Sequence, residues 1–70
     1  MRPTIIPPKA LADLVTRAAR NDGCVRHGDT YLFAAGNIVS VVTGPLDCAV
    51  GHVYRDPVKA AEIRNALEAK

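Results

Sequence analysis

The segment Ile38–Thr43 reads Ile-Val-Ser-Val-Val-Thr, and it constrains the fold of this chain more than any other segment. Alternate residues of a β-strand point to opposite faces of the sheet, and this strand places valine or isoleucine on both faces. The segment Thr30–Ala34 likewise has large apolar side chains on both. An antiparallel sheet with one face in water would alternate apolar and polar residues instead. We therefore expect a sheet that is covered on both faces.

Two arrangements would provide that cover. One helix covers each face in a closed monomer, or both helices cover one face and a second copy of the chain covers the other. A chain of 70 residues buries only a thin core, and unpaired edge strands offer a further contact between copies. We favour the homodimer. Its expected interface residues are Leu32, Ile38, Val42, Val50, His52 and Tyr54.

Short turns separate four β-rich segments in the middle of the chain. The segments are residues 24–26, 30–34, 38–43 and 49–55, and Gly, Pro, Asn or Asp stands in each turn between them. Parallel neighbours would need a crossover of about a dozen residues, so we expect a three- to four-stranded antiparallel meander. A helix is expected on each side of the meander in the sequence. The fold class is therefore α+β, in a small single domain of residues 1–70 that begins with an extended arm over residues 1–7.

The two helices have different sequence signals. Residues 8–21 place apolar side chains such as Leu11, Leu14 and Ala18 on one face, and the following Asp22-Gly23 suits a helix end. Asp56 is expected to cap the second helix, and Pro57 to occupy its first helical position.

Charge and composition disfavour several classes of partner. The net charge is +2, and the nine Lys and Arg are interleaved with seven acidic residues, so a nucleic-acid partner is the least favoured. The chain has no apolar run of about 18 residues and no apolar signal core, so we expect a cytoplasmic protein without a membrane partner. Cys24 and Cys48 are expected to remain thiols. Together with His27 and His52 they match no metal-ligand spacing, and no cofactor or metal is expected.

Four polar side chains are the candidates for chemistry: His27, His52, Tyr54 and Arg55. A group of this kind at a sheet could perform general acid–base catalysis on RNA phosphodiesters. The simpler interpretation treats His52 and Tyr54 as amphipathic residues at a rim or an interface. We favour that interpretation, because no other catalytic motif accompanies them.

Three short segments carry a resemblance to a known family: residues 26–31, residues 36–43 and Val53-Tyr54-Arg55. Together they resemble the strand core of small bacterial ribonuclease toxins of the RelE and colicin-D type, over about half of the chain. The resemblance implies a helix before an antiparallel sheet, and a catalytic role for His27, Tyr54 and Arg55 with His52 beside them. Such toxins are usually longer and more basic, and the helix that starts at Asp56 departs from their simplest pattern.

These observations favour a small, non-enzymatic module that binds proteins, as a homodimer or on a host or partner protein. The bias toward Ala, Val, Arg and Asp is typical of high-GC actinobacteria or their phages, which would suit a bacterial or phage accessory factor. The alternative is a ribonuclease toxin that cleaves RNA.

Overall fold

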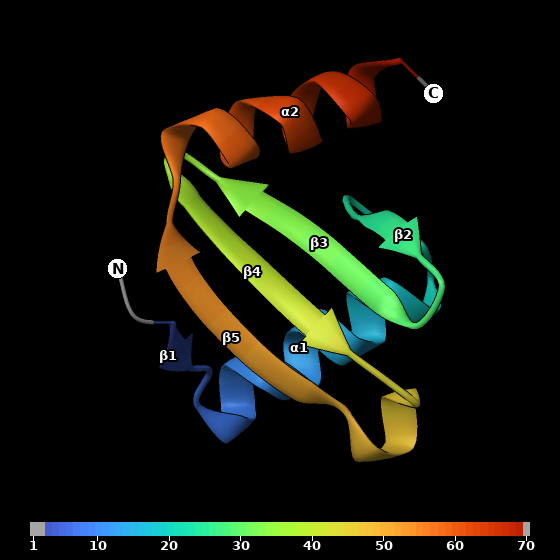
Figure 1. Ribbon diagram of the computed structural model, residues 1–70. Coiled ribbons are helices and arrows are strands. Elements are labelled where there is room, and N and C mark those ends of the chain that lie inside the picture. Colours follow the sequence, from blue (N-terminus) through green and yellow to red (C-terminus); the bar gives the residue numbers. More distant parts are fainter. Residues whose placement is uncertain (1–2, 70) are drawn as a thin grey trace.

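The computed structural model describes residues 3–69, which form a five-stranded antiparallel sheet with a helix on each side (Figure 1). The strand order is β1-β5-β4-β3-β2, and every neighbouring pair is antiparallel. The elements are β1 (Thr4–Ile5), α1 (Pro8–Ala19), β2 (Val25–His27), β3 (Thr30–Ala35), β4 (Ile38–Thr43), the short 3₁₀ helix η1 (Leu46–Cys48), β5 (Val50–Arg55) and α2 (Pro57–Glu68). The expected α+β class, with an antiparallel meander between two helices, is confirmed.

The sheet has one strand more than expected, and it comes from the N-terminal arm. Thr4 pairs with Val53 and Ile5 with His52, so β1 forms the sheet edge beside β5. The contact continues where the Ile6 amide donates a 3.1 Å hydrogen bond to the Gly51 carbonyl. Met1 and Arg2 of the expected arm lie outside the described residues.

Two tight turns set the register of the meander. Gly28 and Gly36 have φ of 61° and 59°, and each is the first residue of a two-residue loop between paired strands. This is the position that a type II′ hairpin turn reserves for glycine, because L side chains rarely adopt positive φ. The hairpins bring β3 and β4 into full antiparallel pairing from Thr30↔Thr43 to Ala35↔Ile38.

The helix α1 ends two residues earlier than expected, at Ala19. Asn21 takes the left-handed conformation with φ of 54°. The Asp22 amide donates to the Arg17 carbonyl at 2.9 Å and the Asn21 amide to the Ala18 carbonyl at 3.0 Å. This pair of bonds is a Schellman motif, which satisfies the last carbonyls of the helix.

The helix α2 starts as the sequence predicts. The Asp56 carboxylate accepts a 3.0 Å hydrogen bond from the Lys59 amide, and Pro57 follows in the first turn. The Arg64 side chain donates a hydrogen bond to the Gly36 carbonyl in the turn between β3 and β4. The Arg64 contact ties α2 to the sheet.

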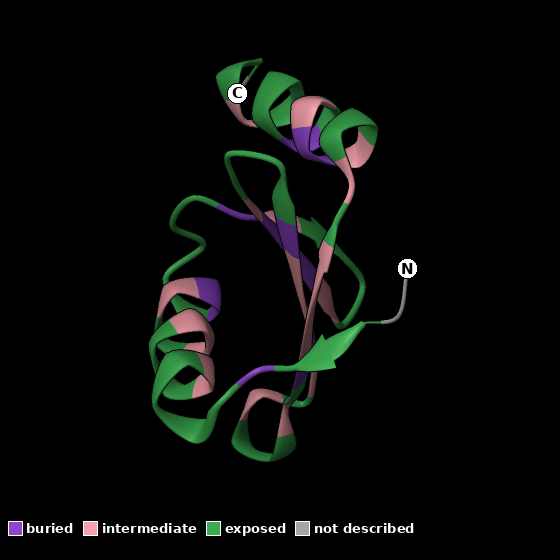
Figure 2. Cartoon of the chain, turned by 90° about the vertical axis from the view of Figure 1, so that its left-hand side faces the viewer, coloured by how far each residue is buried: buried purple, intermediate pink, exposed green. Residues whose placement is uncertain are grey.

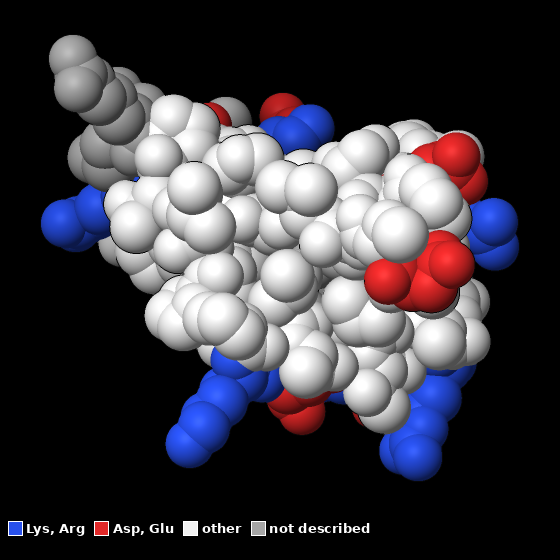
Figure 3. Space-filling model, turned by 90° about the horizontal axis from the view of Figure 1, so that it is seen from below, with Lys and Arg blue, Asp and Glu red and all other residues white. Residues whose placement is uncertain are grey.

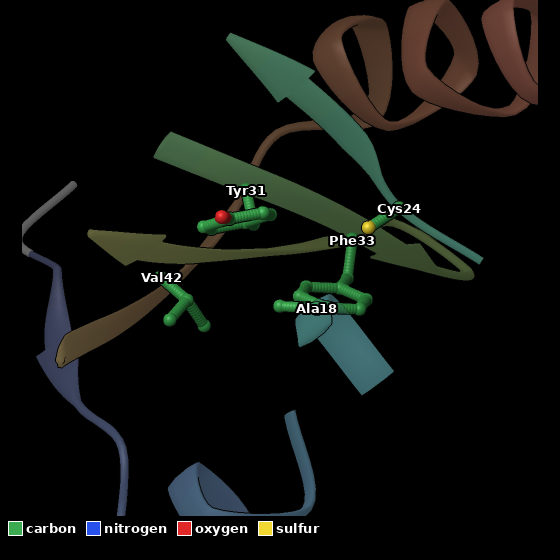
Figure 4. Packing of buried hydrophobic residues seen from close by; sticks show 5 residues of the cluster. All are labelled: Ala18, Cys24, Tyr31, Phe33 and Val42. Carbon is green, nitrogen blue, oxygen red and sulfur yellow. The ribbon is translucent and has the colours of Figure 1, made fainter. Parts of the chain in front are cut away.

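The two helices lie on opposite faces of the sheet (Figure 2). On one face, Tyr31, Phe33 and Val42 pack with Ala18 of α1 and with Cys24, and Phe33 reaches from the sheet toward the helix (Figure 4). We call this side the α1 face.

The opposite side is the α2 face. There Leu32 and Val39 pack with Ala60 and Ile63 of α2. The expectation that both helices cover one face is therefore wrong. Because both faces of β3 and β4 are apolar, one helix on each face removes more apolar surface from water than two helices on one face.

Candidate interaction surface

Each helix covers only part of its face. The helix α2 packs on β3, β2 and β4, and it crosses one end of the strands (Figure 1). No helix lies over the other end of this face, where β1 and the start of β5 lie (Figures 1 and 2). The uncovered end is therefore open to a partner.

The strand register places five side chains in and beside this uncovered area, which we call the open strip. Val41 and Tyr54 form its border, where they also pack against the cluster under α2. Ile5 and Val41 lie on either side of His52 in the register, and Val50 and Tyr54 share the face of His52 because they are two residues away. Ile5 is 73% exposed and Val50 is 52% exposed, while the other three are half-buried. None of the five is Lys, Arg, Asp or Glu. The open strip is thus a largely apolar, uncharged surface on the part of the α2 face that no helix covers.

The structure distributes the expected interface residues over three places. Val50, His52 and Tyr54 lie in the open strip, whereas Ile38 lies on the α1 face and is 40% exposed. Val42 is fully buried under α1, and Leu32 is 8% exposed under α2. These last two side chains lie inside the chain and are not accessible to a partner. The surface available to one partner is therefore smaller than the expected set.

Ile5 belongs to the open strip although the sequence interpretation did not include it. The pair Ile5-Ile6 stands between prolines, and in a strand neighbouring side chains point to opposite faces. Ile6 is accordingly 3% exposed, while Ile5 is 73% exposed. The Ile5-Ile6 pair could have predicted this exposed side chain, because one of two adjacent isoleucines in an edge strand must lie outside the core.

A groove lies between α1 and η1 on the α1 face of the sheet. It has a volume of about 470 Å³. Its lining is mostly apolar and comes from Pro8, Leu11, Ala12, Val15, Thr16, Leu46, Asp47, Cys48 and Ala49. On the underside of the molecule, where α1 and η1 lie, most charged side chains stand at the margin (Figure 3). The groove is therefore a second apolar surface, on the opposite side of the sheet from the open strip.

The four candidates for catalysis do not converge. His52 and Tyr54 share the α2 face of β5, but Arg55 follows on the opposite face. His27 ends β2 at the other edge of the sheet. Three strand spacings separate β2 from β5, which is roughly 14 Å at about 4.8 Å each. No single substrate bond could contact all four side chains.

Two arginines occupy positions that sequence periodicity does not indicate. The Arg17 guanidinium carbon lies 5.0 Å from the centroid of the Phe33 ring, and that of Arg26 lies 5.5 Å from the Tyr31 ring. Arg17 stands at the edge of the apolar helix face that Leu11, Leu14 and Ala18 form. It is half-buried because its long side chain reaches from the helix edge across the ring.

Neither a cluster of metal ligands nor a membrane-spanning helix occurs within residues 3–69. No three His, Cys, Asp or Glu side chains gather there as metal ligands, and no helix in that range combines the length and apolar character needed to cross a bilayer. Cys24 is buried and Cys48 is exposed, and no disulfide joins them. No protein-family model, curated protein or solved structure matches the chain.

Proposed function

We propose that the protein acts by binding proteins rather than by catalysis, and that its first partner is a second copy of itself. The open strip carries this proposal. It exposes Ile5 and Val50 to 73% and 52% beside half-buried apolar neighbours. Contiguous exposed apolar surface of this kind is typical of interaction sites.

A second copy suits the open strip for electrostatic reasons. A two-fold dimer places the same patch of both chains in contact, so a patch with charges of one sign would repel its copy. The open strip has no charged side chain, which removes that repulsion. His52 and Tyr54 add polar tips on apolar bodies, and such side chains are favoured at interfaces.

The size of the molecule is also compatible with self-association. The described chain has 4626 Å² of accessible surface, and a standard interface buries about 800 Å² on each partner. The dimer would therefore cover about a sixth of each chain's surface. The open strip would form its centre.

The experiment is light scattering during size-exclusion chromatography over a hundredfold range of protein concentration. The expected mass at the upper end is twice the chain mass of 7.5 kDa. Val50→Glu would bury one carboxylate from each chain in the same apolar interface. It would weaken the dimer at least roughly 30-fold, since each lost valine contact contributes about 1 kcal/mol before any repulsion.

Val58→Glu is the matched control. Val58 is 70% exposed on α2, and its substitution makes the same chemical change outside the open strip. The expected mass of this variant equals that of the wild type. A mass of 7.5 kDa for the wild type at every concentration, or equal weakening by both variants, would overturn the proposal.

The wider role that we propose is an accessory factor of bacterial or phage type that acts on a host or partner protein. Its test is induced expression in a bacterium, with growth and RNA integrity measured together. Growth arrest with intact RNA, abolished by Val50→Glu and retained by Val58→Glu, is expected. Unchanged growth, or arrest that persists in the Val50 variant, would contradict it.

The ribonuclease alternative stays a prediction, and no feature of the site favours it, because His27 lies at the far edge of the sheet from His52. The same expression experiment addresses it. RNA cleavage that His52→Ala and Arg55→Ala abolish would replace the binding proposal with this alternative. Intact RNA in all strains would rule out the ribonuclease alternative.

A further inference from the structure

The α1 face carries two arginine side chains that lie over neighbouring aromatic rings. Arg17 comes from α1 and lies over Phe33, and Arg26 comes from β2 and lies over Tyr31. The two rings share one face of β3 because they are two residues apart, which places them about 7 Å apart along the strand. Two cationic groups from separate elements are thus held on one small area, far from the open strip.

Further contacts hold both guanidinium groups in place. The Arg26 Nε donates a 2.9 Å hydrogen bond to the Gly28 carbonyl. The Arg17 Nη2 lies so close to Gly23 that a Cβ atom there would be 2.8 Å away. A guanidinium that is already positioned loses little conformational freedom when it binds a ligand. The two groups are therefore preorganised.

Neither guanidinium has an acidic partner in the part of the chain that the structure describes. Within residues 3–69, the ion pair that forms within 4.0 Å joins Lys59 and Glu62 on α2. Asp22 and Asp29 stand in the flanking loops, but neither carboxylate reaches an arginine to this distance. The cationic charge of the pair is therefore not neutralised by the chain itself.

A third arginine adds to the charge. Arg20 is exposed and follows Arg17 by three residues at the end of α1, so the two are neighbours on the helix surface. We propose that Arg17 and Arg26, with Arg20 beside them, form a binding site for phosphate groups. A guanidinium over a ring still has Nη groups for a ligand, and these match phosphate oxygens in pairs.

The spacing and the charge select the class of ligand. Each guanidinium lies over its own ring, and the two rings are roughly 7 Å apart along the strand. A single carboxylate is too small to contact both guanidinium groups at that separation. A ligand with two linked phosphate groups can contact both. Such a ligand is either a small diphosphate compound or the backbone of a single-stranded nucleic acid, and both present the same chemistry.

The experiment is calorimetric titration of the full chain with inorganic pyrophosphate at low ionic strength. Saturable binding with a Kd below about 1 mM is expected. Arg17→Gln and Arg26→Gln should each weaken it at least tenfold. Arg17→Lys should weaken it severalfold, because lysine keeps the charge but lacks the planar fork. Circular dichroism and thermal melting of each variant show whether the fold is retained.

Arg55→Gln is the matched control, since Arg55 is exposed on the same face at the far end of β5. It removes one charge without touching the site, and its Kd should stay within twofold of the wild type. Absence of saturable binding, or equal loss in the Arg55 variant, would overturn the proposal, because net charge alone would then explain the result. Neither result depends on the oligomeric state of the protein.

A single-stranded oligonucleotide of eight thymidines distinguishes the two sources of phosphate. Tighter binding than that of pyrophosphate, with a salt slope near −1.4 for two contacted phosphates at about −0.7 each, identifies a nucleic-acid backbone. Weaker binding identifies a small diphosphate ligand. In either case Arg17→Gln must reduce the affinity, and an oligonucleotide that binds this variant normally would contradict the assignment.

Discussion

Val39 and Val42 test the arrangement of one helix on each face, because they lie three residues apart on opposite faces of the same strand. Both are fully buried, Val39 under α2 and Val42 under α1. Each substitution to alanine removes two methyl groups, at about 0.8 kcal/mol each. A residual cavity of roughly 40 Å³ adds about 1 kcal/mol. We expect each variant to lose about 2.5 kcal/mol of unfolding free energy, which lowers the Tm by roughly 10–20 °C for a chain of this size.

The assay is urea denaturation followed by circular dichroism, at two protein concentrations that differ tenfold. The loss for each variant should be the same at both concentrations, because the chain's own helices provide the burial. Val58→Ala is the control, since Val58 is 70% exposed, and it should change stability by less than about 0.5 kcal/mol. If either Val39→Ala or Val42→Ala lowers the unfolding free energy as little as this control, the helix over that residue does not bury it. The described packing is then refuted.

Three further results are expected from the local geometry. Asp56→Ala removes the cap of α2 and should cost about 1 kcal/mol in thermal or urea unfolding; an unchanged midpoint would mean that the cap does not hold the helix. Gly36→Ala should lower the unfolding free energy by about 1–2 kcal/mol, because φ is 59° in open space and only backbone strain is added; an unchanged unfolding free energy would contradict the strain argument. A thiol reagent such as Ellman's reagent should modify Cys48 at once in the native protein and Cys24 only in denaturant, and fast reaction of two thiols per native chain would refute the burial of Cys24.

Local sequence signals predicted the elements of this fold well. The Asp56-Pro57 start of α2 and the glycine turns were evident because capping and positive φ depend on a few adjacent residues. The strand β1 was not assigned, because two residues between prolines carry no periodicity. Its formation depends on a pairing with β5, which is some 50 residues away in sequence.

The position of each helix on the sheet was the main feature that the sequence left open. Alternation correctly indicated that Val39 and Val42 face opposite ways, but it does not specify which face a helix crosses. The burial of Val42, and the position of Arg17 over Phe33, both follow from that crossing. Val50, His52 and Tyr54 could be predicted as surface candidates because β5 needs only its own alternation to place them together.

Isotope-filtered nuclear Overhauser spectroscopy on a mixture of labelled and unlabelled protein tests the proposed self-association most directly. It detects contacts between two copies only. The methyl groups of Ile5, Val41 and Val50 should show intermolecular contacts with one another and with the rings of His52 and Tyr54. A spectrum without intermolecular contacts at the highest attainable concentration, or with contacts confined to other surfaces, would contradict the account.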